Sequence, residues 1–390
     1  MDSGAFTFQA IERIVYGKPA AEALKAEAQR LGATRVFLMV SGTMNRTTDE
    51  VAKLRAGLGN TYAGLHDHMP PHTPRDAVIE AANQARDAKA DLIVTFGGGS
   101  LTDAGKVVQL CLRHNVTDMD GLEPYRAVTG ADGKLSIPQF DPPIVRQITI
   151  PTTLSGGEFS WQAGCTDPRI KVKQSFRHPL FVPRAVILDP APTVHTPMWV
   201  FLSTGMRAFD HATESLCSLD HANPVWEVSA QQAIRLLRRG LLRVKQDPSD
   251  LAARLECQLA VWLSLAGRQA GVNMGASHAI GHILGGTCDV PHGYTSCVML
   301  PHVMRYNHPV NAARQRLVAE AMGQPDADAA DLIAGFVAEL GLPGRLSEVG
   351  VTREQFPVIA KNTMHDPWLY TNPRKIGTPE QVTEILEAAA

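Results

Sequence analysis

The chain has 390 residues, of which 44% are hydrophobic and 19% are charged, and its 37 basic and 39 acidic side chains leave a formal net charge of -2. This composition is typical of a globular protein, and the length predicts two domains of ordinary size. The balanced charge, without any run of Lys or Arg, argues against nucleic acid or a membrane as a partner. We therefore expect a small-molecule substrate.

The first residues do not predict a secretion signal, because Asp2 and Ser3 stand where a basic region would lie and no continuous apolar stretch follows. No apolar run reaches the roughly 18 residues that a membrane span needs. The six cysteines are scattered without a CxxC pair, which predicts neither a disulfide framework nor a cysteine-built zinc site. We expect six reduced cysteines in a cytoplasmic protein.

The first half of the chain alternates strand and helix signals. Short apolar runs are typical of buried parallel strands, and they occur at residues 35–40, 90–96 and 144–150. Helical segments are expected between them at 48–58 and 74–88. This alternation predicts a doubly wound parallel sheet, which binds ligands at the carboxyl ends of its strands. The polar segment 129–143 is expected to form a surface excursion or a hairpin.

From about Asp189 onward the strand signals disappear. Long stretches rich in Ala and Leu predict helices instead, at 208–219, 228–244, 251–270, 325–340 and 379–389. The expected fold class is α/β plus all-α, with an α/β dinucleotide-binding domain over residues 1–188 and a helical catalytic domain over residues 189–390.

Two polar loops follow predicted strands. Gly97-Gly-Gly-Ser100 precedes a helical segment, so its backbone amides can approach a pyrophosphate at a helix N-terminus. Residues 151–160 add hydroxyls and glycines, and Thr152 and Thr153 can bond ribose or phosphate oxygens. A plain turn at the first loop and helix capping by Ser155 at the second are the alternatives. Two such loops at neighbouring strand ends favour a nucleotide site.

Four histidines form the densest chemical signal. His278 and His282 are four residues apart and share one face of a helix. His292 lies in a Pro-His-Gly turn that can double back toward that face, and His211 belongs to another helical segment. Neutral imidazole is the commonest metal ligand and is suited to proton transfer near neutral pH. The pattern favours a functional site over isolated structural histidines.

The chain resembles the iron-containing alcohol dehydrogenase superfamily in four blocks, which occur in the family's order at residues 97–106, 151–153, 205–214 and 278–302. The resemblance implies a Rossmann-like N-terminal domain, a helical C-terminal domain, a nicotinamide cofactor and a homodimer. It also implies nucleotide contacts by Gly98, Gly99, Ser100, Asp103, Thr152 and Thr153.

The choice between NAD and NADP stays open. Ser41, which we also expect at the nucleotide, follows the first predicted strand in Ser41-Gly-Thr-Met-Asn45. This segment lacks the acidic residue that commonly bonds the adenosine ribose in NAD enzymes. Arg46 is near enough to receive a 2′-phosphate, although a surface arginine is the plainer interpretation.

Metal-dependent members of the superfamily hold iron or zinc with one Asp and three His. By resemblance, the three histidine ligands correspond to His211, His278 and His292, and His282 corresponds to an active-site histidine that is not a ligand. The aspartate position is Arg207 here, and a guanidinium offers a metal no lone pair. Asp210 projects roughly 100° away from His211 on a helix, so it is a poor substitute. Iron or zinc is therefore doubtful.

The loop 153–158 and the element Asn372-Pro-Arg374 look most like the maleylacetate reductase branch, which implies reduction of a keto acid without a metal. In the expected mechanism Arg207 orients a carboxylate and, with His278, stabilises the carbonyl oxygen. His292 or His282 then donates the proton, and His211 orients the substrate. The branch typically has another residue at position 207, so its exact substrate does not carry over.

Two alternatives stay open. A metal-dependent alcohol dehydrogenase would use the three histidines alone, with Arg207 turned aside. A nucleotide-binding protein without turnover would have lost its chemistry when Arg207 entered. A lyase similar to 3-dehydroquinate synthase is disfavoured, because it would need an acidic metal ligand where Arg207 stands.

Overall fold

The computed structural model describes residues 7–129, 135–220 and 223–390, which divide into two compact units at Thr196 and Pro197. The first unit extends beyond residue 188, where the sequence suggested a boundary. The turn η5 (Ala191–His195) follows the last strand, and the Thr196 hydroxyl then donates to the carbonyl of Thr152 at 2.8 Å. These contacts hold the segment to the first unit.

A six-stranded parallel sheet forms the centre of the first unit, in the order β1-β10-β7-β4-β2-β3. The strands span Arg13–Tyr16 (β1), Val36–Val40 (β2), Tyr62–His66 (β3), Leu92–Gly97 (β4), Arg146–Pro151 (β7) and Ala185–Leu188 (β10). The three predicted strands are β2, β4 and β7, at the middle of the sheet. Edge strands β1 and β3 are only partly buried and lack a continuous apolar run, and β10 is four residues long, so the sequence did not reveal them.

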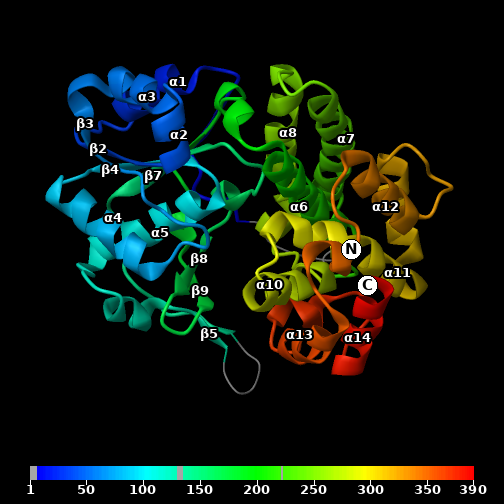
Figure 1. Cartoon of the computed structure of the whole chain (residues 1–390). Coiled ribbons are helices and arrows are strands. Elements are labelled where there is room, and N and C mark those ends of the chain that lie inside the picture. The colour runs from blue at the N-terminus through cyan, green and yellow to red at the C-terminus, as the bar shows by residue number, and fades with distance from the viewer. Residues whose placement is uncertain (1–6, 130–134, 221–222) are drawn as a thin grey trace. The chain divides into compact units, whose positions relative to one another are not determined.

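Helices cover both faces of this sheet, as Figure 1 shows. One side carries α1 (Ala20–Arg30), α2 (Gly42–Thr47) and α3 (Glu50–Leu58), and the other carries α4 (Arg75–Asp87) and α5 (Gly99–His114). Alternate residues of β2 supply the two cores, since Val36 and Leu38 pack with the first group while Phe37 and Met39 pack with the second. The doubly wound α/β fold is confirmed.

Smaller elements decorate the first unit. The hairpin of β8 (Gln162–Asp167) and β9 (Val172–Arg177) was not predicted, and β5 (Val128–Thr129) pairs with β6 (Leu135–Ser136) within the expected excursion. Residues 130–134 of that excursion lie outside the described residues. Short 3-10 turns are η1 (Gly59–Thr61), η2 (Asp120–Tyr125), η3 (Gly157–Phe159) and η4 (Pro179–Phe181).

The second unit consists of helices and turns, and its described residues include no strand. Its helices are α6 (Met198–Cys217), α7 (Pro224–Gln246), α8 (Leu251–Ser264), α9 (Ala266–Gln269), α10 (Ala276–Cys288), α11 (His292–Ala321), α12 (Ala329–Leu340), α13 (Phe356–Thr363) and α14 (Pro379–Ala388). The turns are η6 (Leu346–Val349), η7 (Arg353–Gln355) and η8 (Pro367–Thr371).

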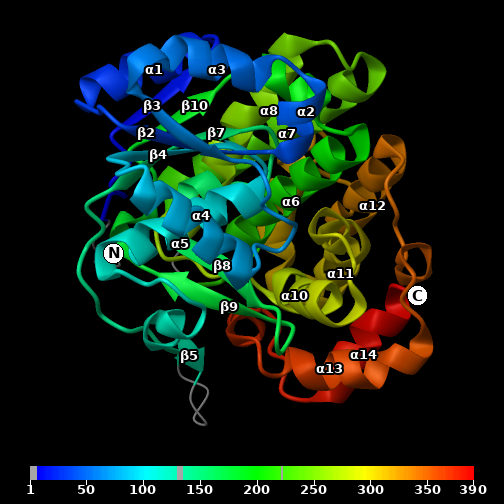
Figure 2. The same ribbon diagram turned by 60° about the vertical axis from the view of Figure 1, so that its left-hand side comes forward.

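Helix α6 lies at the centre of the second unit, packed against α7, α8 and α11 (Figure 2). Most of its side chains are buried, because apolar residues occur on nearly all of its faces. Burial extends to the polar residues Arg207, Asp210 and Glu214. Buried polar groups must be satisfied inside the protein, so α6 requires polar partners from its neighbours.

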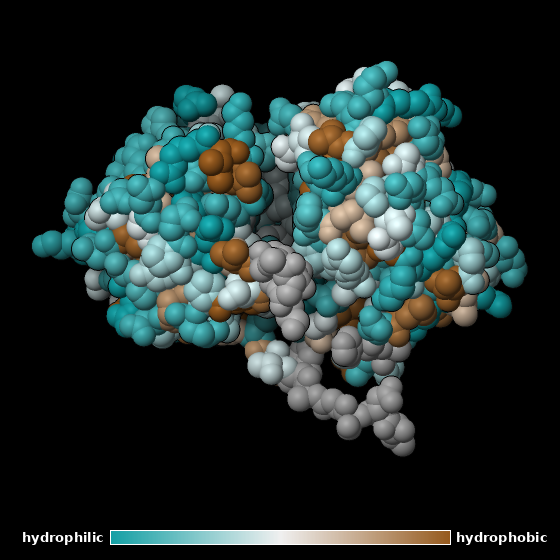
Figure 3. Space-filling model, turned by 90° about the horizontal axis from the view of Figure 1, so that it is seen from below, coloured by the Kyte–Doolittle hydropathy of each residue, from teal (hydrophilic) through white to brown (hydrophobic). Residues whose placement is uncertain are grey.

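No described helix combines the length and apolar character that a bilayer span requires. The face shown in Figure 3 is mostly hydrophilic, with small separate apolar patches. All six cysteines are free thiols, as expected.

Candidate active site

The two glycine-bearing loops contact each other at the carboxyl edge of the sheet. β4 pairs with β7, so the loops that follow these strands are neighbours. A Cβ atom added to Gly98 would lie 3.3 Å from Cγ2 of Thr153, and one added to Gly99 would lie 2.9 Å from Oγ of Ser155. Gly97 has φ +153°, a backbone conformation that other residues rarely adopt. The turn therefore requires glycine.

The N-terminus of α5 fits a nucleotide phosphate. Gly98 is its N-cap residue, and no side chain in the described structure caps it. The first amides of the helix, beginning at Gly99 and Ser100, thus point outward with partial positive charge. This cradle suits a pyrophosphate, as the sequence suggested.

The remaining expected nucleotide residues border this edge. Ser41 follows β2, and its backbone amide donates to the carbonyl of Phe96 at 2.9 Å. Asp103 accepts from the amide of Gly164 at 3.1 Å and lies 3.4 Å from Nζ of Lys106. Lys106 is fully buried and also donates to the carbonyl of Gly157 at 2.7 Å, so it ties α5 to the second loop. Lys106 was not among the residues expected at the site.

We predict that Gly99→Val weakens cofactor binding by about tenfold or more, since 1.4 kcal/mol of lost contact is a tenfold change. The added side chain would push Ser155 and the second loop away from the helix N-terminus. Titration of protein fluorescence with NADH and NADPH measures the effect. Gly335→Val, where an added Cβ meets nothing within 4 Å, is the matched control, and equal affinities in both variants would contradict the prediction.

Four imidazoles gather in the second unit. The ring centroids of His211 and His278 are 4.8 Å apart, and those of His282 and His292 are 6.1 Å apart with nearly parallel planes. The structure thus brings together all the histidines singled out from the sequence. His292 is the first residue of α11 rather than part of a turn, because the helix starts directly after Pro291.

Glu214 fixes the orientation of His278. Its Oε2 lies 2.7 Å from Nδ1 of the imidazole, and the same carboxyl group accepts from the amides of Gly275 at 2.8 Å and Ser277 at 2.9 Å. Burial and the charge of Asp210 raise the pKa of Glu214. Nε2 of His278 is buried without a hydrogen-bond partner among the described residues, so it is the nitrogen left for chemistry.

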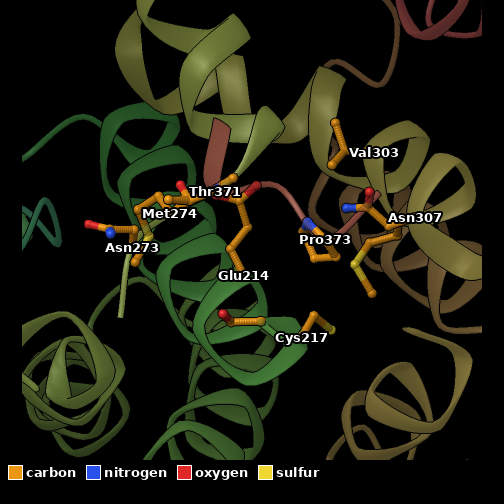
Figure 4. Close-up of a pocket in the computed structure, with 11 residues that line it drawn as sticks. Glu214, Cys217, Asn273, Met274, Val303, Asn307, Thr371 and Pro373 are labelled. Atoms are coloured by element: carbon orange, nitrogen blue, oxygen red, sulfur yellow. The ribbon is translucent and has the colours of Figure 1, made fainter. Parts of the chain in front are cut away.

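A small cavity adjoins Glu214, with Asn273, Met274 and Thr371 in its wall (Figure 4). Its volume of about 10 Å³ suits one water molecule. It is too small for a carbonyl substrate, which must therefore bind elsewhere.

Arg207 is buried in the second unit, and its charge acts on the histidines. Its Nη1 donates to Oγ of Ser296 at 3.1 Å and lies 4.0 Å from Oδ2 of Asp210. Only 3% of the residue is exposed, so its guanidinium does not extend into solvent in this structure. Burial is the largest cause that lowers the pKa of His211 and of His278 well below the ordinary value, and the positive charge of Arg207 is the second largest. Both imidazoles are therefore neutral.

The donor set does not fit the site of three His and one Asp that the family resemblance implies. Arg207 supplies only N–H donors, and its positive charge repels a cation. Within the described structure, one group of side chains could ligate a metal, and its possible ligand atoms all lie within 4.8 Å of one another. It consists of Asp210, Glu214 and His278. Both carboxylates face Nδ1 of His278, however, with Asp210 at 3.5 Å, whereas the unpartnered nitrogen is Nε2.

Asp366 and Trp368 complete the cluster and were missed in the sequence. Oδ2 of Asp366 lies 2.7 Å from Nδ1 of His282, and its Oδ1 accepts from the amide of Trp368. The Trp368 ring is 4.8 Å from the His282 ring and 5.6 Å from the His278 ring. Asp366-Pro-Trp368 signals a capped turn, but nothing local indicates a partner 84 residues earlier.

We predict that His211 and His278 lower the free energy of unfolding as the pH drops below about 6.5, whereas Asp210 and Glu214, whose pKa values are raised by burial to about 6 and about 8, act in the opposite direction. The pKa of His211 and of His278 is lower in the folded protein than the ordinary 6.5, so unfolding takes up protons in this range. Their stabilising contribution is present above 6.5 and is lost toward lower pH, at about 1.4 kcal/mol for each unit of pKa depression. Urea unfolding at pH 7.5, 6.5 and 5.5 measures it. A His211→Asn, His278→Asn double variant with the same pH slope would contradict it.

The first unit carries a Rossmann-like sheet with a glycine cradle, and the second unit carries a buried cluster of imidazoles and a guanidinium. Each feature is typical of a nicotinamide-dependent oxidoreductase. Family models described as iron-containing alcohol dehydrogenase and as Fe-containing alcohol dehydrogenase family, C-terminal, match residues 12–190 and 201–390. The chain belongs to the iron-containing alcohol dehydrogenase family, on its maleylacetate reductase-like branch.

Individual relatives agree with this assignment. The chain is 34% identical to dehydrogenase ALT3 of Alternaria alternata, over 92% of this chain and 99% of that protein. It is 32% identical to a maleylacetate reductase of Burkholderia cepacia, over 95% and 94% of the two chains. The crystal structure of a 1,3-propanediol oxidoreductase matches with a TM-score of 0.89 at 28% identity, and the match covers 99% of this chain and 100% of that one. The expected family, fold and NAD(P)-dependent oxidoreductase activity are confirmed.

Proposed function

We propose that this NAD(P)-dependent oxidoreductase reduces the keto group of a small oxo acid, such as maleylacetate or a related compound, without a metal. The observation that carries the proposal is the buried Arg207, which places a permanent cation among the histidines. Similarity to maleylacetate reductases supports the substrate class. The matched family is described as iron-containing, so the comparisons do not support the doubt about a metal.

The bound nicotinamide would supply the hydride. The side chains of the protein stabilise the negative charge that develops on the substrate and donate the proton. Arg207 stabilises the negative charge that develops on the carbonyl oxygen, where low dielectric makes its N–H donors effective. Glu214, whose pKa is raised to about 8, holds a proton near neutral pH and can donate it to Nδ1 of His278. The proton of the neutral imidazole then lies on Nε2, which donates it in a hydrogen bond to the same oxygen. His211, whose ring lies beside that of His278, orients the substrate. Gly98, Gly99, Ser100, Asp103, Thr152, Thr153 and Ser41 would hold the nucleotide.

The metal-free proposal is tested by composition and turnover together. We expect iron and zinc far below one per chain, and undiminished reduction of 2-oxo and 4-oxo acids with NADH or NADPH after chelation. Arg207→Met should lower kcat by about 10²-fold or more, the usual loss when one oxyanion donor is removed. Elemental analysis and steady-state kinetics measure both.

Other results of this experiment would select an alternative. One iron or zinc per chain whose removal abolishes turnover of aldehydes or primary alcohols would support a metal-dependent alcohol dehydrogenase. Nucleotide binding without turnover of any carbonyl compound would support a binding protein that has lost its chemistry.

The proton donor is proposed to be His282 rather than His292. Asp366 bonds Nδ1 of His282 and so leaves Nε2 to deliver the proton. We predict that His282→Ala lowers kcat by about 10²-fold or more and that Asp366→Asn gives a smaller loss. His292→Ala is the comparison, and a larger effect there than at His282 would reverse the assignment. Stopped-flow single-turnover rates separate these effects from product release.

Cofactor preference, assembly and location also stay proposals. The segment after β2 lacks an acidic residue, so both NAD and NADP are proposed cofactors. The family resemblance supports a homodimer, and the free cysteines agree with a cytoplasmic location.

A further inference from the structure

A second guanidinium lies beside the histidine cluster. Arg268, on the short helix α9, is half-buried, and its Cζ is 5.0 Å from the centre of the Trp368 ring. The same ring also adjoins two imidazoles, since its centre is 4.8 Å from that of His282 and 5.6 Å from that of His278. The indole therefore connects Arg268 to the groups proposed for the chemistry.

The backbone fixes Arg268 in this place. A Cβ atom added to Gly267 would lie 2.8 Å from Cβ of Ser215, so α9 packs directly against α6. Nη1 of Arg268 donates to Oδ1 of Asn273 at 3.2 Å, which orients the guanidinium. The charge of Arg268 also acts on the site. It is the third largest cause of the lowered pKa of His211, behind burial and the charge of Arg207.

Arg207 and Arg268 differ in the anions that they can accept. Arg207 is buried beside two carboxyl groups, since Asp210 and Glu214 both act on its pKa. A permanent carboxylate placed there would be a third acidic group and would lose its hydration. A carbonyl oxygen is neutral until hydride arrives, so it suits Arg207. Arg268 is only partly buried, so it can bind a carboxylate at a smaller desolvation cost.

We propose that Arg268 binds the carboxylate of the substrate while Trp368 packs along the carbon chain and the carbonyl oxygen lies at Arg207. This inference rests on the proposed function and deepens it, because Arg268 becomes the residue that selects oxo acids over neutral ketones. It assigns the orientation of a carboxylate to Arg268 instead of to Arg207, where the sequence suggested it. The planar fork of arginine matches the two carboxylate oxygens.

The test compares 4-oxopentanoate with its methyl ester, which has the same carbonyl and no charge. We expect Arg268→Met to lower the ratio of kcat/KM for the acid to kcat/KM for the ester by about 10- to 100-fold, the value of one charged hydrogen-bond pair. Arg268→Lys should recover part of that ratio. Arg305→Met is the matched control, since Arg305 is an exposed guanidinium of the same unit that pairs with Asp331. Equal losses for acid and ester in Arg268→Met would overturn the proposal.

A binding measurement keeps this test separate from the proposed function. If the wild-type protein reduces neither compound, the proposed function fails. Calorimetric titration of the cofactor-saturated protein with 4-oxopentanoate then decides the role of Arg268. Weaker binding to Arg268→Met than to Arg305→Met, with melting temperatures unchanged, supports it, and equal binding contradicts it.

Discussion

Burial of the Arg207 guanidinium is the constraint on which the site depends. Removing an ion from water costs several kcal/mol, so the surroundings must supply charge and hydrogen bonds. Asp210 supplies the opposite charge, 4.0 Å from Nη1, and Ser296 accepts one N–H bond. Burial, and after it the same positive charge, lowers the pKa of His211 and of His278 well below the ordinary value.

The polar bonds that satisfy α6 also assemble the site from distant segments. Glu214 holds the N-terminus of α10, and the Ser277 hydroxyl donates to Asp210 at 2.7 Å. Asn372 accepts from the amide of Ala276 at 3.1 Å and exchanges hydrogen bonds with Asn307, which explains the Asn-Pro-Arg element as a structural tie. The hydrogen bonds that satisfy these buried polar groups therefore also position the imidazoles.

Local signals predicted the parts of the molecule that local physics controls. Burial on both faces gives strands β2, β4 and β7 continuous apolar runs, and burial along one stripe gives the long helices regularly spaced apolar residues. Both signals can be recognised in the sequence. Strands β1, β3 and β10 and the β8–β9 hairpin were missed, since short or half-exposed strands leave no such period. Asp366 was missed because its partner is contributed by another helix.

The doubly wound sheet, the helical second half, the glycine cradle and an arginine at the position of a carboxylate ligand could all be predicted from the amino-acid sequence. The inward direction of Arg207, the available Nε2 of His278 and the position of Asp366, Trp368 and Arg268 beside the histidines follow from the folded structure alone. Helical spacing and chain composition act over a few residues. The bonds that define the site join side chains 64 and 84 residues apart, and only packing can bring such groups together.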